Sequence, residues 1–311
     1  MLSRTAASLY WIGRYMERAE FTSRLVEATL RLSALGHHAH SDQAWHSALS
    51  VVGAELSFAE WGESFTPENV TRYLSLAESN PSSIRSCIAA ARANARAART
   101  ALSIGTWEQI NRAWLLVRDR AKPGGTQATM NLVDSLRAEF RGFEGALGRM
   151  LRNEGHWFMR LGSVVERGDS TARLLDVKYY LLLPPGQEVG GALDRDQWTT
   201  ILQIVSAKTA YRHIYREALQ PWLVADFLIF RREMPHSLAS SAEETVNILN
   251  EFAARSGRQG PADRLARQRL ARMGDVSIET VIQGGLHEWL NRHIAENAAL
   301  DTAIAQQFRF D

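Results

Sequence analysis

The amino-acid sequence predicts an all-α fold, a helical bundle built from two duplicated multi-helix units. Apolar residues recur at spacings of three and four along most of the chain, which is the period of a helix with one buried face. Alternating β-branched residues, which would indicate strands, are scarce. One motif also occurs twice, as GRYMERAEFTSRL from Gly13 and as GSVVERGDSTARL from Gly162.

The breaks between helices follow from proline, glycine and capping residues. The first helix is predicted to begin after Ser3, as its N-cap, and to stop at Gly36. The stretch Asn80-Pro81-Ser82 should open another helix, because proline is tolerated in a first turn. Further breaks are predicted at Gly105, at residues 122–125, at residues 184–186 and around residues 257–261.

The repeated motif continues into a longer internal repeat. The aligned pairs lie 149 positions apart, and they are Gly13 with Gly162, Glu17 with Glu166, Arg18 with Arg167, Glu20 with Asp169, Thr22 with Thr171, Arg24 with Arg173, and Leu25 with Leu174. Downstream, WHSALSVV at Trp45 matches WTTILQIV at Trp198, and the stretch from Val70 matches that from Val224. We therefore predict two helical repeats, at residues 1–155 and 156–311, packed together as one compact unit.

Composition restricts the class of protein. A chain of 311 residues with 45% hydrophobic content can bury a sizeable core. The net charge is only +2, so we do not expect nucleic acid as a partner. Cys87 is the only cysteine, which excludes an internal disulfide and suits a reducing compartment. Without a signal-peptide core or a long apolar stretch, we expect a cytoplasmic protein that does not enter a membrane.

The acids and arginines of the motif are the candidate functional residues. In the first copy, helical spacing places Glu17, Glu20 and Arg24 on one stripe of the helix, with Arg18 beside it. In the second copy, Glu166, Asp169 and Arg173 form the same stripe, with Arg167 beside it. Three interpretations stay open. The residues could form a buried network that joins the halves, a binding or catalytic site, or surface ion pairs worth about 0.3–0.5 kcal/mol each.

The helix after Pro81 carries a second stripe of arginines. Its members are Arg85, Arg92, Arg96 and Arg99, next to an apolar stripe of Ile84, Ile88, Ala91, Ala95, Ala98 and Leu102. One hypothesis is that some of these arginines meet Glu17 and Glu20. The alternatives are a solvated basic face, or an anion site completed by Asn94 and Asn111 for an amino acid, a peptide terminus or an acyl phosphate.

Two other polar segments have simpler interpretations. His37, His38 and His40 follow Gly36, where an exposed connector is expected, and we predict neither a metal nor a cofactor. The basic segment near the C-terminus is predicted to be a solvated helix end, with a contact for an acidic partner or nucleic acid as the alternative; its arginines are Arg264, Arg267, Arg269 and Arg272.

The chain also resembles a known family, the bacterial alpha-E domain proteins, which are helical chains named for a Glu-Arg motif. The resemblance rests on LSRTAASLYWIGRYMERAE, ERGDSTARLLDVKYYLLLP, NPSSIRSCIAAARANARAARTALS and WEQIN. It implies a link to a circularly permuted ATP-grasp-like ligase and a transglutaminase-like peptidase, and so to peptide or amide-bond metabolism. The family-like positions are Glu17, Arg18, Glu166, Arg167, Arg92, Asn94, Arg96, Trp107 and Asn111. Phe21, Tyr180 and His236 depart from the family pattern.

Two functional hypotheses follow from these residues. In the first, the protein is an accessory or binding component that orients a partner or substrate through the Glu/Arg cluster and has no turnover as an isolated chain. In the alternative, it is a stand-alone enzyme of amide or peptide chemistry. Glu17 or Glu166 would then act as acid and base, and Arg18 or Arg167 would hold an anion.

Overall fold

The computed structural model describes residues 1–34, 38–119, 125–180 and 191–310. The described residues contain helices and no strand, so the predicted all-α class is confirmed. In chain order the elements are α1 (Ser3–Ala34), α2 (His38–Val51), α3 (Glu55–Glu60), α4 (Pro67–Ser75), α5 (Ile84–Ala97), a 3-10 turn (Arg99–Ala101), α6 (Ile104–Asp119), α7 (Gly125–Gly148), α8 (Glu154–Tyr180), α9 (Ala192–Ile204), α10 (Lys208–Tyr215), α11 (Pro221–Phe230), α12 (Leu238–Ser256), α13 (Pro261–Gly274), α14 (Ile278–Gly284) and α15 (Leu286–Phe308).

Several helix boundaries differ from the prediction by a few residues. Ser3 is the first residue of α1 and not its cap, and Gly36 lies outside the described residues. Helix α5 begins at Ile84, because Ser83 Oγ accepts a hydrogen bond of 3.1 Å from the backbone N–H of Ser86. Residues 80–82 form a turn before it, in which the Asn80 side chain accepts a hydrogen bond of 2.9 Å from the Ser82 N–H.

Glycine has a different role at each of two predicted breaks. Gly105 lies inside α6, and the break comes earlier, where Ser103 Oγ accepts a hydrogen bond of 3.1 Å from the Thr106 N–H. At Gly257 the break is confirmed, because its φ of 69° ends α12 in the left-handed region that glycine adopts without strain. Helix α13 then starts at Pro261. The predicted break at residues 184–186 lies outside the described residues. Of the predicted break at residues 122–125, only Gly125 is described, and it is the first residue of α7.

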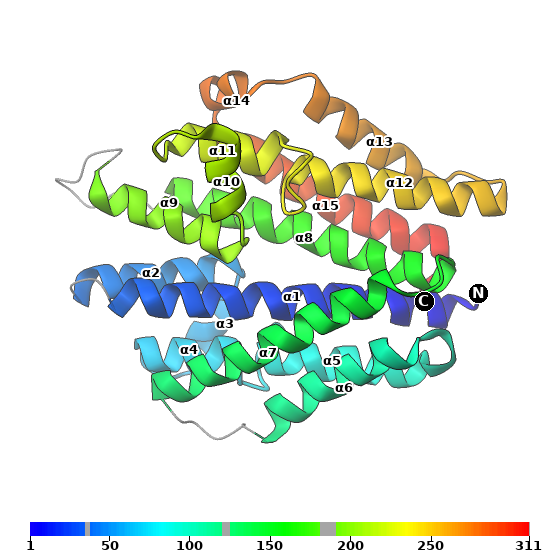
Figure 1. Cartoon of the computed structure of the whole chain (residues 1–311), viewed down its shortest axis with the longest axis horizontal. Coiled ribbons are helices and arrows are strands. Elements are labelled where there is room, and N and C mark those ends of the chain that lie inside the picture. The colour runs from blue at the N-terminus through cyan, green and yellow to red at the C-terminus, as the bar shows by residue number, and fades with distance from the viewer. Residues whose placement is uncertain (35–37, 120–124, 181–190, 311) are drawn as a thin grey trace.

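The two helices that carry the repeated motif, α1 and α8, lie side by side through the middle of the molecule (Figure 1). Helix α1 also packs against α5 and α7, and α8 packs against α12 and α15. Both chain ends lie at the same end of the bundle in Figure 1. The motif residues are therefore carried by the helices with the most neighbours, at the centre of the fold.

Glycine allows α1 and α8 to approach closely. A Cβ atom at Gly13 would lie 2.0 Å from the Met159 carbonyl oxygen, and a Cβ at Gly162 would lie 2.0 Å from the Tyr10 carbonyl oxygen. Any side chain at either position would force the backbones apart. The two contacts are reciprocal, because Tyr10 and Met159, like Gly13 and Gly162, are 149 positions apart.

The buried apolar side chains form two clusters, one toward each end of α1 and α8. The first contains residues 6–19 of α1 and 158–165 of α8, while the second contains residues 25–30 and 172–175 of the same helices. Both clusters draw side chains from before and after residue 155. The duplication and the boundary between residues 155 and 156 stay predictions.

The predicted core stripe of α5 is confirmed. Ile84, Ile88, Ala91, Ala95 and Ala98 are fully buried or nearly so, and Leu102 is half-buried. Cys87 lies in the same cluster, and burial raises the pKa of its thiol to about 12. This value keeps the thiol protonated at neutral pH, as expected for a small core residue.

Candidate functional site

The Glu-Arg motifs of α1 and α8 face each other near the middle of the two helices. Arg167 of α8 donates from Nε and from a terminal nitrogen to the two carboxylate oxygens of Glu17 on α1, each at 2.7 Å. Both side chains are almost fully buried, with 5% of Arg167 and 9% of Glu17 exposed. Paired donors on paired acceptors form the strongest kind of ion pair that these side chains make.

The opposite pair completes the arrangement. Arg18 of α1 donates to both carboxylate oxygens of Glu166 on α8, at 2.5 and 3.0 Å. The acid of each helix is thus held by the arginine of the other, and we call Glu17, Arg18, Glu166 and Arg167 the Glu-Arg quartet. Of the three interpretations of the motif, the contacts of these four residues match a buried network that joins α1 to α8.

Arg14 is a further member of this network that the sequence reasoning did not include. Its Nε donates to Glu166 at 2.7 Å, and a terminal nitrogen lies 2.6 Å from the Asp301 carboxylate on α15. The guanidinium is buried, although its counterpart 149 positions later is Ser163. Arg14 lies one helical turn before Arg18, so its place on the charged stripe of the helix could have indicated that it belongs to the network.

The electrostatics of the quartet keep Glu166 ionised. Burial raises the pKa of Glu166, but the positive charges and hydrogen bonds of Arg14 and Arg18 outweigh it, and the pKa lies below its ordinary value. Burial alone would lower the pKa of Arg167, yet Glu17 raises it above the usual arginine range. The buried charges are therefore compensated within the network, as a low-dielectric environment requires.

The other charged residues of the motif pair within their own helices. Arg24 Nε donates to Glu20 at 3.0 Å, and Arg173 Nε donates to Asp169 at 2.7 Å. Burial and the neighbouring charge of Glu17 raise the pKa of Glu20. The predicted acid-before-base pairs at a spacing of four are thus present, and they flank the quartet.

The hypothesis that the arginine stripe of α5 meets Glu17 and Glu20 is wrong. Among the described residues, the partners of these acids come from α1 and α8. Arg92 instead donates to Asn111 at 2.8 Å and stacks on Trp114, with its guanidinium carbon 3.7 Å from the ring centre. Arg99 stacks on Trp107 at 4.9 Å.

The remaining residues of the α5 stripe lie on the outer part of the helix. Arg85 pairs with Glu78 at 2.5 Å, and Arg96 is exposed. The Asn94 side chain donates to the Ala90 carbonyl of its own helix at 3.0 Å. The stripe faces away from the quartet because the apolar stripe of α5 is the side that packs on α1.

A small recess adjoins the Glu17–Arg167 pair. Its volume is about 10 Å³, and its lining includes Glu20, Thr171 and His236. This volume holds about one water molecule. Burial and the charges of Arg167 and Arg24 lower the pKa of His236 to about 3, so its ring is neutral at neutral pH.

One arginine of the basic segment near the C-terminus is buried, which corrects the prediction of a fully solvated helix end. Arg269 is 5% exposed, and burial lowers its pKa to about 10. Its guanidinium contacts Asn297 at 2.6 Å and His293 at 2.5 Å. Asn297 in turn donates to the Val165 carbonyl of α8 at 3.1 Å, so this cluster ties α13 and α15 to the central helix.

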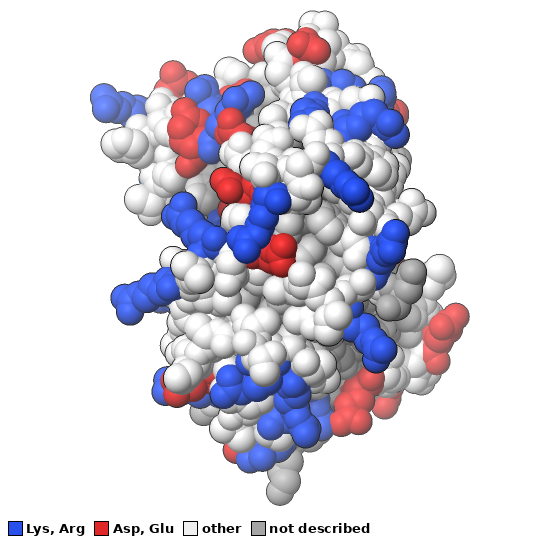
Figure 2. Space-filling view, turned by 90° about the vertical axis from the view of Figure 1, so that its right-hand side faces the viewer, with Lys and Arg blue, Asp and Glu red and all other residues white. Residues whose placement is uncertain are grey.

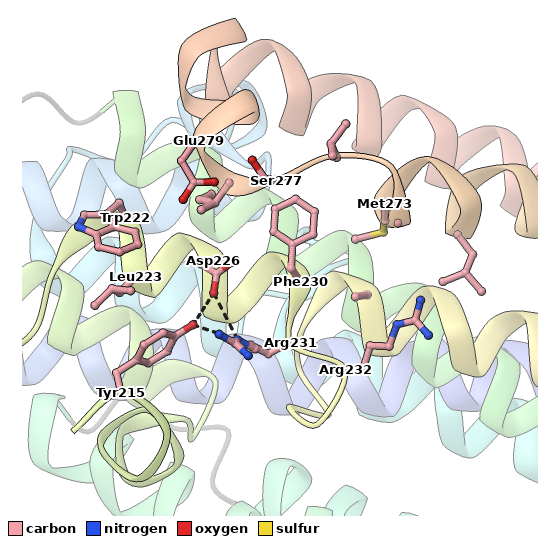
Figure 3. A pocket seen from close by; sticks show the side chains of 15 residues that line it. Tyr215, Trp222, Leu223, Asp226, Phe230, Arg231, Arg232, Met273, Ser277 and Glu279 are labelled. Carbon is pink, nitrogen blue, oxygen red and sulfur yellow. Dashed lines mark hydrogen bonds and ion pairs between the residues drawn. The ribbon is translucent and has the colours of Figure 1, made fainter. Parts of the chain in front are cut away.

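A pocket lies between α11, the end of α13 and the start of α14 (Figure 3). Its volume is about 510 Å³, within the range typical of ligand sites. Trp222, Phe230 and Met273 contribute apolar walls. Trp222 is 47% exposed, which is unusual for so large an apolar side chain.

A group of three polar side chains lies on one side of this pocket. Tyr215 donates its hydroxyl proton to Asp226 at 2.5 Å, and Arg231 Nε lies 3.3 Å from both the Tyr215 hydroxyl and the Asp226 carboxylate (Figure 3). Burial and the bond to Asp226 raise the pKa of Tyr215, which keeps it a donor. Glu279 from α14 lies across the pocket from Arg231.

Within the described ranges, no group of three or more histidine, cysteine, aspartate or glutamate side chains is placed to hold a metal ion. His37 and the side chains of His38 and His40 lie outside the described residues. Figure 2 shows basic and acidic side chains interspersed with uncharged ones on the face that carries the chain ends. Every described helix is too short or too polar to cross a lipid bilayer.

Comparison with known proteins places the chain in one family. Residues 1–308 match the Alpha-E family, described as a predicted alpha-helical domain with a conserved ER motif. Searches of curated proteins and of solved structures gave no match. The sequence contains the dipeptide Glu-Arg twice, at Glu17–Arg18 and at Glu166–Arg167, and both lie in the quartet. Because the match spans essentially the whole sequence, the chain belongs to the Alpha-E family.

Proposed function

We propose that the protein is an accessory or binding component of an ATP-grasp-linked system of peptide or amide-bond metabolism, without turnover as an isolated chain. The class of partner is what the family resemblance implies. The single observation that carries the non-catalytic role is the reciprocal pairing of the quartet. This pairing supports a structural role for the motif, in which its acids and arginines join α1 to α8 and do not act on a substrate.

The state of the two acids favours this role over the stand-alone enzyme. A general acid or base must exchange a proton with a substrate within hydrogen-bond reach, and its pKa should lie near the working pH. Glu166 is held by Arg14 and Arg18 with a lowered pKa, and both oxygens of Glu17 accept from Arg167. The adjoining recess has room for about one water molecule, which is too little for an amino acid.

Under this proposal, the partner or substrate binds at the pocket between α11, α13 and α14. An amino acid or a short peptide suits its chemistry. The apolar walls around Trp222 would contact the side chain of such a ligand. The terminal nitrogens of Arg231 would bind its carboxylate, and Glu279 would bind its ammonium group. The exposed Trp222 would also serve as an aromatic anchor for a partner protein.

The test compares the isolated protein with a mixture that contains its ATP-grasp partner. We expect no ATP consumption or amide formation by the protein alone, and stimulation of the partner, or copurification with it, when both are present. Trp222→Ala should weaken this effect by about tenfold or more, because aromatic anchors dominate binding energy. Ile104→Ala, at another exposed apolar side chain, is the matched control and should leave it unchanged.

The competing enzyme hypothesis makes the opposite prediction. It requires turnover by the isolated protein that is lost in Glu17→Gln while the melting temperature stays the same. Under the accessory proposal, Glu17→Gln lowers the melting temperature, because Arg167 loses its buried counter-charge. Turnover that follows the first pattern would contradict the proposal.

A further inference from the structure

A groove with an excess of positive charge lies beside the second half of α1. Its volume is about 300 Å³, and four helices contribute to its lining. Arg24 and Arg31 come from α1, Arg137 and Arg141 from α7, and Lys208 from α10. Gln203 of α9, Ser206 and Thr209 add uncharged polar groups. Nothing in the Glu-Arg quartet accounts for this convergence of five cations.

The carboxylates around the groove do not balance these cations. Glu27 pairs with Arg31 of its own helix and with Arg137 of α7. Glu20 pairs with Arg24, and Asp134 lies 3.4 Å from Arg137. Five cations against three carboxylates leave an excess of two positive charges. Arg141 and Lys208 form no ion pair with any residue in the described part of the chain.

The pairing also fixes the positions of three guanidinium groups. Arg24 is held by Glu20 on one side and donates to Ser206 Oγ on the other. Arg31 and Arg137 are both held by Glu27, whose side chain is 11% exposed. These arginines therefore lose little side-chain freedom when a ligand binds, which favours affinity. Arg141, exposed, and Lys208, half-buried, supply the uncompensated charge.

The start of α10 lies at the same groove. Lys208 and Thr209 are the first two residues of α10, and no side chain caps this end of the helix. The first amides of a helix have no partner inside the helix, and the helix dipole makes this end positive. Both residues line the groove, so the positive end of α10 lies at its edge.

We propose that this groove binds a small phosphorylated molecule through its phosphoryl group. A phosphoryl group carries close to two negative charges at neutral pH, which matches the excess of two positive charges. Its oxygens point in several directions and accept from several donors, which suits donors that arrive from four helices. A planar carboxylate would be satisfied by a single arginine fork. A ligand here is independent of the accessory role proposed above, because none of its contacts involves the pocket between α11, α13 and α14.

The experiment is a calorimetric titration of the full-length protein with pyrophosphate, a phosphoryl probe, and with citrate, a carboxylate probe of comparable charge. We expect pyrophosphate to bind about tenfold or more tightly than citrate, because the donor geometry suits phosphoryl oxygens. The double variant Arg141→Gln/Lys208→Gln should weaken pyrophosphate binding by about tenfold or more, since both uncompensated charges are removed.

A control variant removes the same charge elsewhere. Arg112→Gln/Arg149→Gln alters two exposed arginines outside the groove, and it should leave pyrophosphate affinity within about twofold of the original. Circular dichroism melts of both double variants check that each one folds. Equal weakening by the two double variants would mean that net charge alone drives binding, and would overturn the proposal. No measurable pyrophosphate binding, or citrate binding as tight as pyrophosphate, would overturn it as well.

Discussion

The guanidinium of Arg167 lies 2.7 Å from each carboxylate oxygen of Glu17, across the line where α1 meets α8. Arg18 and Glu166 repeat this contact in the opposite direction. The two Glu-Arg dipeptides of this chain therefore form the two halves of one joint between α1 and α8. The joint also sets the register of the two central helices, because shifting either helix by one residue would break both pairs.

The two arginines of the quartet should differ in their contribution to stability. Arg167→Met leaves Glu17 buried without a bidentate partner, so we expect a loss of about 3–5 kcal/mol in the free energy of unfolding. Arg18→Met should cost less, because Arg14 still holds Glu166 and Arg18 is 27% exposed. Arg173→Met removes a half-exposed pair within one helix and should cost under about 1 kcal/mol. Urea unfolding of the three variants measures the loss of unfolding free energy in each. Equal losses in the three variants would contradict the expected order.

The close approach of α1 and α8 predicts opposite effects for two glycine-to-alanine changes. Gly162→Ala should destabilise the protein by several kcal/mol or prevent folding, because the new methyl would lie 2.0 Å from the Tyr10 carbonyl oxygen. Gly145→Ala, within α7, has open space around it and should stabilise by about 0.5–1 kcal/mol through helix propensity. Thermal melts compare the two, and tolerance of Gly162→Ala would argue against this helix packing.

Stability should fall as the pH is lowered from about 6.5 toward 3, partly because of His236. Its pKa is about 3 in the folded protein and near the ordinary value of 6.5 when unfolded, so only the unfolded chain takes up this proton in that window. The contribution is at most about 1.4 kcal/mol per pH unit. His236→Gln should flatten the slope of unfolding free energy against pH, whereas His213→Gln, at an exposed histidine, should not. An unchanged slope in His236→Gln would contradict this assignment.

The sequence predicted features that depend on neighbours along one helix. The all-α class follows from the apolar period, and the pairs Glu20–Arg24 and Asp169–Arg173 follow from a spacing of four. The partner of Glu17 could not be predicted in this way, because it depends on which helix lies opposite. The arginines of α5 were plausible candidates by charge, but the apolar stripe of that helix is the one that faces α1.

Arg14 and Arg269 show why some buried charges were missed. Arg14 aligns with Ser163 in the second copy, so a comparison of the two copies discards it, and its partner Asp301 comes from distant α15. Arg269 lies in a basic segment that suggests solvent exposure. Its spacing from the buried Ala266 and Met273, three and four residues away, nevertheless places it on the inner face of α13. Helical period was a better guide to its burial than local charge.

The most direct test of the structural joint is a double-mutant cycle on Glu17 and Arg167, with unfolding free energies measured in urea. We expect Glu17→Met and Arg167→Met each to cost about 3–5 kcal/mol, because each strands one buried charge. The double variant should cost less than either single change, because no charge is then left without its partner. Losses that simply add in the double variant would show that the two side chains do not stabilise each other, and would contradict the account.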